Sequence, residues 1–423
     1  MKLRLASTAD RRQAGARLRG DSTSLVLSSA ATSALGLVFW VAATRLYPVE
    51  AVGQATTAVN AATVLAGVAN LSLGPLYERF LPAAGALRAR LVGAGLVLSA
   101  VLSVVLGTVF LAVTSADGLV TSRAQALAFV AAVVVLAAFA LLDAVLIGAH
   151  RARWAALKNT AHAVAKLVAI VLVSCAGTGF TIVLGWIVPA AVAVVVIEVL
   201  LLTVLRRGGR QEPHTLPAAR ELAGYAGVSF GWMIAQAVPG LVVPVLVLSI
   251  AGVDQAAYYN IAWTVVTASL LVTSLIAGPY VSAAARPGAD LPGLTRSFIR
   301  VLALVCLLRG LGVAVAGPVA LMLYGTEYAQ AGTPLLVVMG VVHLLSGPGH
   351  LYGALARVHR RIGYPMVVQA VGSVVLVVLV ARWLEPMGIM AVAWAYLVHD
   401  LLVLAAAIPP LVALLRVTLR ERR

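Results

Sequence analysis

The sequence predicts an all-α polytopic membrane protein of about twelve transmembrane helices, with both termini on the cytoplasmic side. Hydrophobic residues make up 62% of the 423 and charged residues only 11%, whereas a soluble domain carries about 25% charged residues. The apolar residues form runs longer than the roughly 18 residues that mark a membrane span. With so few charges, most of the surface of the folded chain must face lipid.

The apolar runs follow one another along the whole chain, and the connections between them are short. Short connections favour antiparallel packing of neighbouring helices. We expect spans at residues 22–46, 51–80, 89–114, 122–149, 154–177, 179–205, 221–251, 254–284, 294–322, 329–355, 361–382 and 387–416.

The longest polar segments are the N-terminal tail, 1–21, and a stretch with Arg-Arg-Gly-Gly-Arg and two prolines. The second of these divides the series of spans into halves. A shift of the sequence by 204 residues pairs Gly74-Pro75 with Gly278-Pro279, which indicates a parallel repeat. We therefore predict an N-terminal six-helix lobe over 22–205, a cytoplasmic linker over 206–220, a C-terminal six-helix lobe over 221–416 and a basic tail over 417–423.

The basic residues alternate between the two sides of this topology. With the N-terminus inside, 26 of the 31 Lys and Arg residues fall in inner segments and only Arg45, Arg123 and Arg382 in outer loops. Such a bias places the basic loops and both termini in the cytoplasm. It also excludes a nucleic-acid-binding protein, because the net charge of +16 is spread over short clusters and forms no single patch.

Nothing in the sequence predicts an enzyme, a cofactor or a metal site. Cys175 and Cys306 each lie inside an apolar run, and no Cys/His spacing suits a metal. A membrane glycosyltransferase or polysaccharide polymerase is disfavoured, because the predicted outer loops are too short to carry its acidic catalytic residues.

Two short stretches resemble a known family. The segment Ala42–Gly53 (AATRLYPVEAVG) resembles the first outer loop of polysaccharide-type flippases in the multidrug/oligosaccharidyl-lipid/polysaccharide (MOP) exporter superfamily. Leu323–Ala329 (LYGTEYA), before the tenth span, is similar to a loop of the same family, and the basic turns His150–Arg153 and Arg357–Arg361 also fit.

The resemblance implies two six-helix lobes around a central cavity that opens alternately to each side of the cell (cytoplasmic) membrane. The polysaccharide branch moves polyprenyl-diphosphate-linked oligosaccharide or polysaccharide precursors from the inner to the outer leaflet, for cell-envelope biosynthesis. Its expected partners are this lipid-linked glycan, membrane lipids and polysaccharide-synthesis enzymes. The alternative is a cation-coupled multidrug or metabolite exporter of the same superfamily.

Two departures from the wider superfamily bear on this choice. The lipid II flippase branch usually adds two helices after the twelfth, and this chain ends soon after Leu415. Many proton-coupled drug exporters carry an acid within the first helix, and residues 25–44 contain none. Both departures favour the sugar-lipid branch.

Ionisable residues within spans are the first site candidates, because a charge at a helix centre costs about 2.5–3.5 kcal/mol on insertion scales. Lys166, Arg309 and Asp400 lie near helix centres, and Asp143 and Glu198 toward inner ends. In one interpretation, Lys166 and Arg309 attract the substrate diphosphate and the acids couple transport to protons or sodium. In the other, Lys166 pairs with Asp143 or Glu198, and Arg309 pairs with Asp400.

Further candidates are polar residues of helices that line the cavity in this family. Arg79 is either a first contact at the cytoplasmic mouth or a positive-inside anchor. Asn60, Asn70, Gln236 and Asn260 either line the cavity or form interhelical hydrogen bonds.

Pro239 and Gly240 lie in the middle of the seventh span, as does Pro244. Proline removes a backbone hydrogen bond and kinks a helix, so we expect either a hinge or a static kink at Pro239–Gly240. The histidines within spans, such as His343, are interpreted as packing residues.

Overall fold

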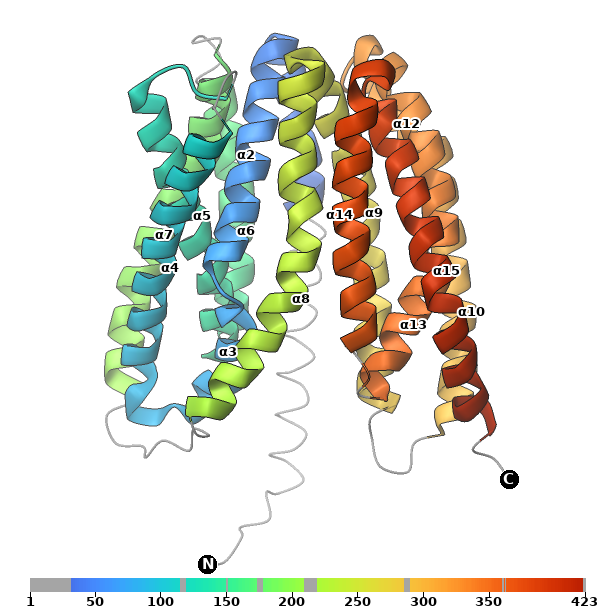
Figure 1. Ribbon diagram of the computed structural model, residues 1–423. Coiled ribbons are helices and arrows are strands. Elements are labelled where there is room, and N and C mark those ends of the chain that lie inside the picture. The colour runs from blue at the N-terminus through green and yellow to red at the C-terminus, as the bar shows by residue number, and fades with distance from the viewer. Residues whose placement is uncertain are drawn as a thin grey trace, which may run out of the picture. The chain divides into compact units, whose positions relative to one another are not determined.

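The computed structural model describes residues 32–114, 119–149, 151–172, 178–208, 219–284, 290–359, 361 and 363–420, and the regular elements in these ranges are all helices (Figure 1). The predicted tail 1–21, most of the linker 206–220 and the last residues of the basic tail lie outside the described residues. Each of the twelve predicted spans corresponds to a helix or to consecutive helices, so the all-α polytopic fold is confirmed.

The helices fall along the chain as predicted, with several spans divided into shorter helices. After a first helix, Thr32–Leu46, come α2 (Val49–Ala69), α3 (Leu73–Phe80), α4 (Arg88–Val113), α5 (Arg123–Gly148), α6 (Ala152–Leu172), α7 (Gly179–Gly208), α8 (Ala219–Leu246), α9 (Val253–Ala284), α10 (Leu291–Leu311), α11 (Gly317–Met322), α12 (Thr326–Leu345), α13 (Gly347–Val358), α14 (Gly363–Met387) and α15 (Met390–Arg420). Five-residue π-helical turns follow α8 (Val247–Ala251) and α10 (Gly312–Ala316).

Length and apolarity identify the membrane-spanning helices. In the described residues, eight segments are long and apolar enough to cross a membrane, and Thr32–Leu46 and Ala237–Ala251 are shorter apolar helices. The eight segments comprise α4–α7, α10 with α11, α12, α14 and α15. The chain is therefore a multi-pass membrane protein.

The second predicted span, 51–80, is divided into α2 and α3. Leu71 and Ser72 have left-handed backbone angles, with φ of 46° and 58°. Pro75 has no N–H and cannot bond back to the carbonyl of Leu71, four residues earlier. A continuous helix is therefore interrupted at this point, and the same reasoning applies to Pro348, which follows the division between α12 and α13.

The described chain forms two compact units, and each unit is made of three separate stretches of the sequence. The N-terminal unit comprises Met1–Ala43, Leu65–Ser115 and Ser122–Phe230, and the C-terminal unit comprises Thr44–Val64, Ala116–Thr121 and Gly231–Arg423. The first part of α2 therefore belongs to the unit that contains α9–α15. Gly53 of α2 explains this grouping, because a Cβ at Gly53 would collide with the carbonyl oxygen of Val253 at the start of α9.

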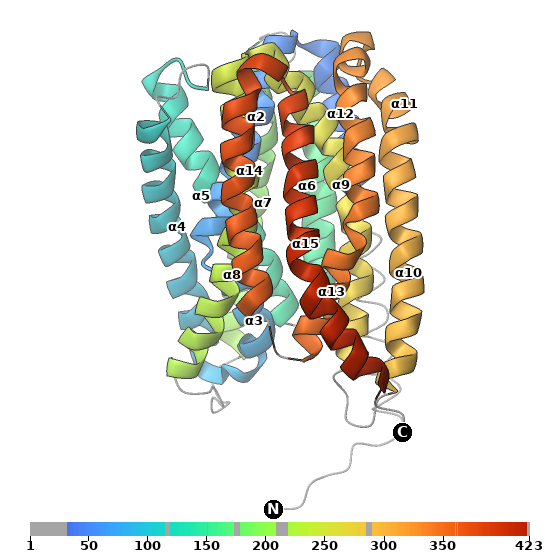
Figure 2. The ribbon, with the colours of Figure 1, turned by 45° about the vertical axis from the view of Figure 1, so that its right-hand side comes forward.

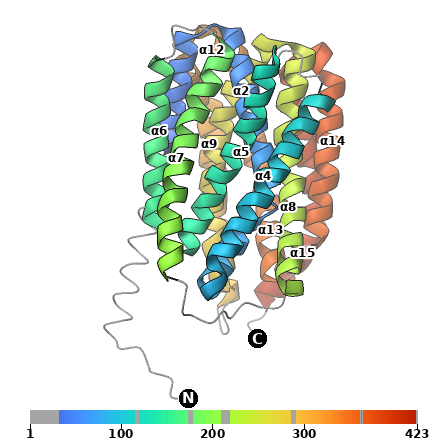
Figure 3. The same cartoon turned by 90° about the vertical axis from the view of Figure 1, so that its left-hand side faces the viewer.

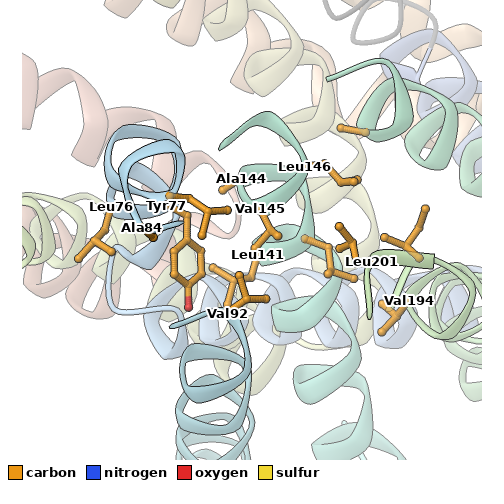
Figure 4. Packing of buried hydrophobic residues seen from close by; sticks show 14 residues of the cluster. Leu76, Tyr77, Ala84, Val92, Leu141, Ala144, Val145, Leu146, Val194 and Leu201 are labelled. Carbon is orange, nitrogen blue, oxygen red and sulfur yellow. The ribbon is translucent and has the colours of Figure 1, made fainter. Parts of the chain in front are cut away.

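The core of the N-terminal unit lies where α3, α4, α5 and α7 pack together, and α4, α5 and α7 face the viewer in Figure 3. Tyr77 is directed toward Val92 and Leu141 (Figure 4), and its hydroxyl donates a hydrogen bond to the carbonyl oxygen of Leu91 at 2.9 Å. The phenol of Tyr77 can be buried because its one polar group has this partner.

The core of the C-terminal unit lies among α9, α10, α13 and α15. The rings of Tyr280 and Phe298 stack with centroids 4.2 Å apart, and the Tyr280 hydroxyl lies 2.9 Å from that of Thr295. In this unit the first turns of α10 and α14 and the last turns of α15 lie at the same end (Figure 2). Arg296 and Arg416 therefore belong to one end of the unit, whereas Arg382 belongs to the end where α14 turns into α15, in agreement with the predicted topology.

Candidate functional site

Lys166 of α6 is buried against aromatic rings within the N-terminal unit. Its Nζ lies 3.4 Å from the ring centroid of Trp186 in α7 and 5.3 Å from that of Phe39 in the first helix. Trp40 stacks on Trp186 at 5.6 Å. The side chain is 4% exposed, and within the described residues it forms no salt bridge. Lys166 is thus held by cation–π interactions.

Asp143 of α5 pairs with Lys158, which disfavours the alternative in which Lys166 pairs with Asp143. The Lys158 Nζ lies 3.0 Å from Asp143 Oδ1 and donates to the carbonyl oxygen of Phe139 at 2.6 Å. Asn159 Nδ2 donates to Asp143 Oδ2 at 3.1 Å. This cluster joins α5 to α6.

Lys158 was not among the site candidates predicted from the sequence, and it was counted only with the basic residues of the inner side. It lies almost two turns inside α6, which begins at Ala152. The spacing of Lys158, His162 and Lys166 at i, i+4 and i+8 could have revealed it, because such residues share one face of a helix. His162 also lies on this face, with Nε2 3.1 Å from the carbonyl oxygen of Trp186.

Arg309 of α10 is 4% exposed and contacts a histidine that the sequence interpretation had treated as packing. Its Nη2 lies 3.2 Å from Nδ1 of His343 in α12. The Nε2 of His343 lies 3.3 Å from the hydroxyl of Ser269 in α9. Arg309 therefore belongs to a hydrogen-bonded chain that connects three helices of the C-terminal unit.

Asp400 of α15 lies beside its sequence neighbour, with Oδ1 2.9 Å from Nδ1 of His399. Its carboxylate is also close enough to act electrostatically on Arg309 and on His350 of α13. The C-terminal unit thus gathers an arginine, an aspartate and three histidines among apolar helices.

Three of the four amide candidates form interhelical hydrogen bonds. Asn60 of α2 donates to Asn260 Oδ1 of α9 at 3.0 Å, and Asn260 donates to Thr57 Oγ1 at 3.0 Å. Asn70 donates to the carbonyl oxygen of Ala137 in α5 and accepts from Ser99 of α4 at 2.6 Å. These bonds favour the structural interpretation of the three side chains. The side chain of Gln236 lies outside the described set.

The remaining candidates are placed on their helices. Arg79 lies in α3, but its side chain is not among those described. Glu198 is half-buried in α7, among residues of the N-terminal core. The helix α8 passes through the buried Pro239 and through Gly240, and it continues to the π-helical turn at Val247–Ala251.

The two stretches that carry the family resemblance contact each other within the C-terminal unit. Arg45, from Ala42–Gly53, donates from Nε and Nη2 to the carbonyl oxygen of Leu323 at 3.2 and 3.0 Å. Leu323 opens the second stretch, and burial raises the pKa of its neighbour Tyr324 to about 12. The resemblance therefore rests on residues that form one local structure.

Metal binding receives no support from the part of the chain that the structure describes. No group of three or more His, Cys, Asp or Glu side chains there could hold a metal ion.

Comparisons with known proteins show a shared fold. No protein-family model and no curated protein matches the chain. An inward-facing multidrug resistance MATE family transporter of the MOP superfamily matches with a TM-score of 0.67 and 14% identity, over 90% of this chain and 95% of that one. The lipid II flippase MurJ in an inward closed conformation matches with a TM-score of 0.66 and 12% identity, over 93% and 89%.

A MOP superfamily transporter from Pyrococcus furiosus, described as having a binding pocket of reverse polarity that suggests a different function, has a TM-score of 0.61. It shares 14% identity and matches over 93% of this chain and 95% of that one. The chain therefore has the all-α fold of MOP superfamily transporters and flippases.

Proposed function

We propose that the chain is a flippase that moves a polyprenyl-diphosphate-linked oligosaccharide or polysaccharide precursor from the inner to the outer leaflet of the cytoplasmic membrane. The fold supports a transport function, because it is shared with multidrug transporters and with a lipid II flippase. In this proposal the lobes 22–205 and 221–416 give the substrate alternating access to the two sides of the membrane. The partners are the lipid-linked glycan, membrane lipids and polysaccharide-synthesis enzymes.

One observation carries the choice of an anionic substrate. Lys166 is a buried cation that is held by the rings of Trp186 and Phe39 and by no carboxylate of the described residues. A desolvated ammonium without a counter-charge is costly in a membrane protein. A diphosphate that approaches Lys166 supplies the missing negative charge, because phosphate oxygens accept strong charge-assisted hydrogen bonds.

The other candidates have subsidiary roles in this proposal. Arg309 is the second contact for the diphosphate, and Arg79 and Gln236 are contacts along the entry route. Asn60, Asn70 and Asn260 hold helices in place, as their hydrogen bonds indicate. Asp143 neutralises Lys158, and Glu198 and Asp400 are coupling candidates.

The second candidate function is a cation-coupled multidrug or metabolite exporter. The multidrug transporters among the structural matches favour it, as does the carboxylate of Asp400 beside His399. An exporter of cationic drugs needs an acidic group where its substrate binds.

Depletion of the protein followed by lipid extraction separates the two functions. Under the flippase proposal, one polyprenyl-linked glycan accumulates in the inner leaflet after depletion. Unchanged lipid intermediates together with increased drug sensitivity would instead establish the exporter.

A further inference from the structure

The hydrogen bonds around His343 determine its protonation state. The guanidinium of Arg309 can only donate, so the His343 Nδ1 that it contacts at 3.2 Å must be an acceptor without a proton. On the other side of the ring, the Ser269 hydroxyl donates to the carbonyl oxygen of Val266 at 2.7 Å. This hydroxyl therefore accepts the proton of His343 Nε2 at 3.3 Å. The structure assigns a neutral His343 with its proton on Nε2.

Protonation of His343 and its bond to Arg309 exclude each other. A proton on Nδ1 removes the acceptor that Arg309 uses and places two positive charges at hydrogen-bonding distance. Both side chains are 4% exposed, so water screens this repulsion poorly. A protonated His343 must therefore separate from Arg309 unless an anion lies between them.

Arg309 is the cation in contact with His343, and Arg357 of α13 acts electrostatically on the neighbouring His350. Cys306 of α10, His350 of α13 and Asp400 of α15 interact electrostatically with Arg309, and Asp400 bonds to His399 on the same helix. The π-helical turn Gly312–Ala316 and α11 contain no titratable residue, and α9 contributes the neutral Ser269.

The backbones of α10 and α12 approach each other closely next to the pair. Gly310 and Gly340 face each other so closely that a Cβ on Gly340 would lie 2.7 Å from the carbonyl oxygen of Gly310. The side chains of Leu344 and Ala314 fill the space beside the two glycines. The π-helical turn begins three residues after Arg309, and such turns interrupt the regular helix frequently at functional sites.

We propose that Arg309 and His343 form a proton-linked site for a phosphate or diphosphate group, in which neutral His343 holds Arg309 until an anion and a proton bind together. The incoming anion replaces His343 as the acceptor for Arg309, and His343 takes up one proton from solvent on Nδ1. The two cations then face the anion from α10 and α12. This deepens the proposed function, because it rests on Arg309 as a diphosphate contact and makes the protonated His343 a second contact for the same group.

In this proposal proton binding and anion binding strengthen each other, whereas in a proton–substrate exchanger they weaken each other. In an exchanger the proton and the substrate compete for one acid, so acidification weakens binding. Here acidification strengthens anion binding, by at most tenfold per pH unit for a single linked proton.

The test uses the full-length protein in nanodiscs of zwitterionic lipid, with sulfate as the anion, because the charge of sulfate is constant between about pH 5 and pH 8. We expect the affinity for sulfate to rise as the pH falls, with up to one proton taken up per sulfate in calorimetry in buffers of different ionisation enthalpy. His343→Gln keeps a neutral side chain with one acceptor and one donor group but cannot take up a proton, so its sulfate binding should be weak and independent of pH. His359→Gln, at the end of α13, is the matched control and should retain the pH dependence.

Nitrogen NMR of histidine-labelled wild-type protein tests the assignment without any variant. It should show a neutral Nε2-protonated His343 without sulfate and an imidazolium with it. The inference is overturned if Nδ1 carries the proton in the neutral ring, or if sulfate binds equally at both pH values. It is also overturned if His343→Gln binds sulfate with the wild-type pH dependence.

Experiments with a second ligand test this inference separately from the proposed function. A short polyprenyl diphosphate should show the same proton uptake, whereas phosphatidylglycerol added to the nanodisc should not replace it. Proton-linked sulfate binding in a protein that moves no lipid-linked glycan would support the site and reject the flippase. Linkage with sulfate but not with polyprenyl diphosphate would overturn the assignment of the site to the lipid-linked substrate.

Discussion

Asn60 and Asn260 meet side chain to side chain, with the Nδ2 of Asn60 3.0 Å from the Oδ1 of Asn260. The second asparagine extends the contact to Thr57, so two residues of α2 are bonded to one residue of α9. Asn260 is 1% exposed. This buried polar contact joins the first part of α2 to α9 within the C-terminal unit.

Replacement of Asn260 by Ala should destabilise the protein, because Asn60 and Thr57 lose their partner together. Hydrogen bonds between membrane helices contribute about 0.6 kcal/mol on average and at most about 1.7 kcal/mol. We expect a loss of about 1 kcal/mol in the free energy of unfolding, measured in detergent. Thr63→Val is the control, because its hydroxyl bonds to Val59 of its own helix.

A double-mutant cycle of Asn60→Ala and Asn260→Ala should then give a positive coupling energy. Strictly additive effects would show that the two side chains act independently, as residues that line a cavity would.

Replacement of Lys158 by Met should be more damaging, because it leaves the carboxylate of Asp143 without its counter-charge. Loss of one partner of a buried pair costs about 3 kcal/mol or more. Because the Asp143 side chain keeps 29% of its exposure, we expect a value near this lower bound, measured by reversible unfolding. The double variant Lys158→Met with Asp143→Leu should recover most of the loss.

Lys166→Met is the matched control for this pair. It removes a buried ammonium that forms no salt bridge in the described structure. Its stability should be unchanged or higher, and a loss as large as that of Lys158→Met would show that a hidden acid pairs with Lys166.

The positions of the helices follow from the sequence because lipid imposes a simple rule on length and apolarity. The interruption at Leu71–Ser72 could also have been predicted from the sequence, since Pro75 cannot donate a hydrogen bond to the carbonyl of Leu71. It was missed because the apolar pattern continues through the interruption. Prolines do not always interrupt a helix, and α8 continues through Pro239 and Pro244.

The partners of the buried charges could not be predicted from the sequence. Arg309 and His343 are 34 residues apart, and their meeting depends on the close approach of α10 and α12 at Gly310 and Gly340. Arg45, at the end of the first helix, meets Leu323 in the turn after α11, 278 residues away, and helical periodicity does not predict this contact. Local patterns give the faces of helices, whereas packing decides which faces meet.

Pro239 and Gly240 provide a test of the hinge prediction in α8. Pro239→Ala restores a backbone N–H and should slow transport severalfold, because a regular helix bends less readily. Gly240→Ala should also slow transport while leaving the fold intact, since its Cβ would lie an acceptable 3.8 Å from Val64 Cγ2. The measurement is the rate of flipping by each variant and by the wild type, in liposomes with equal protein density.

Pro189→Ala, at another proline inside a helix, is the control for these variants. It should transport at the wild-type rate. A wild-type rate for Pro239→Ala itself would leave only a static kink.

The membrane potential should drive outward flipping, because the substrate is an anion and the cell interior is negative. A potential of roughly 100 mV is worth about 2.3 kcal/mol per charge. Collapse of the potential in proteoliposomes should therefore slow the outward flux. An unchanged flux at clamped zero potential would mean that the diphosphate charge is fully compensated during the crossing.

The most direct test of the flippase proposal is the movement of a fluorescent polyprenyl-diphosphate-linked oligosaccharide between the leaflets of liposomes that contain the purified protein. We predict rapid exposure of the probe to an impermeant quencher, and a rate at least tenfold lower for Lys166→Gln at unchanged stability. Lys166→Arg should retain most of the activity, because it keeps the charge. Flipping no faster than in protein-free liposomes, or a Lys166→Gln variant as fast as wild type, would contradict the account.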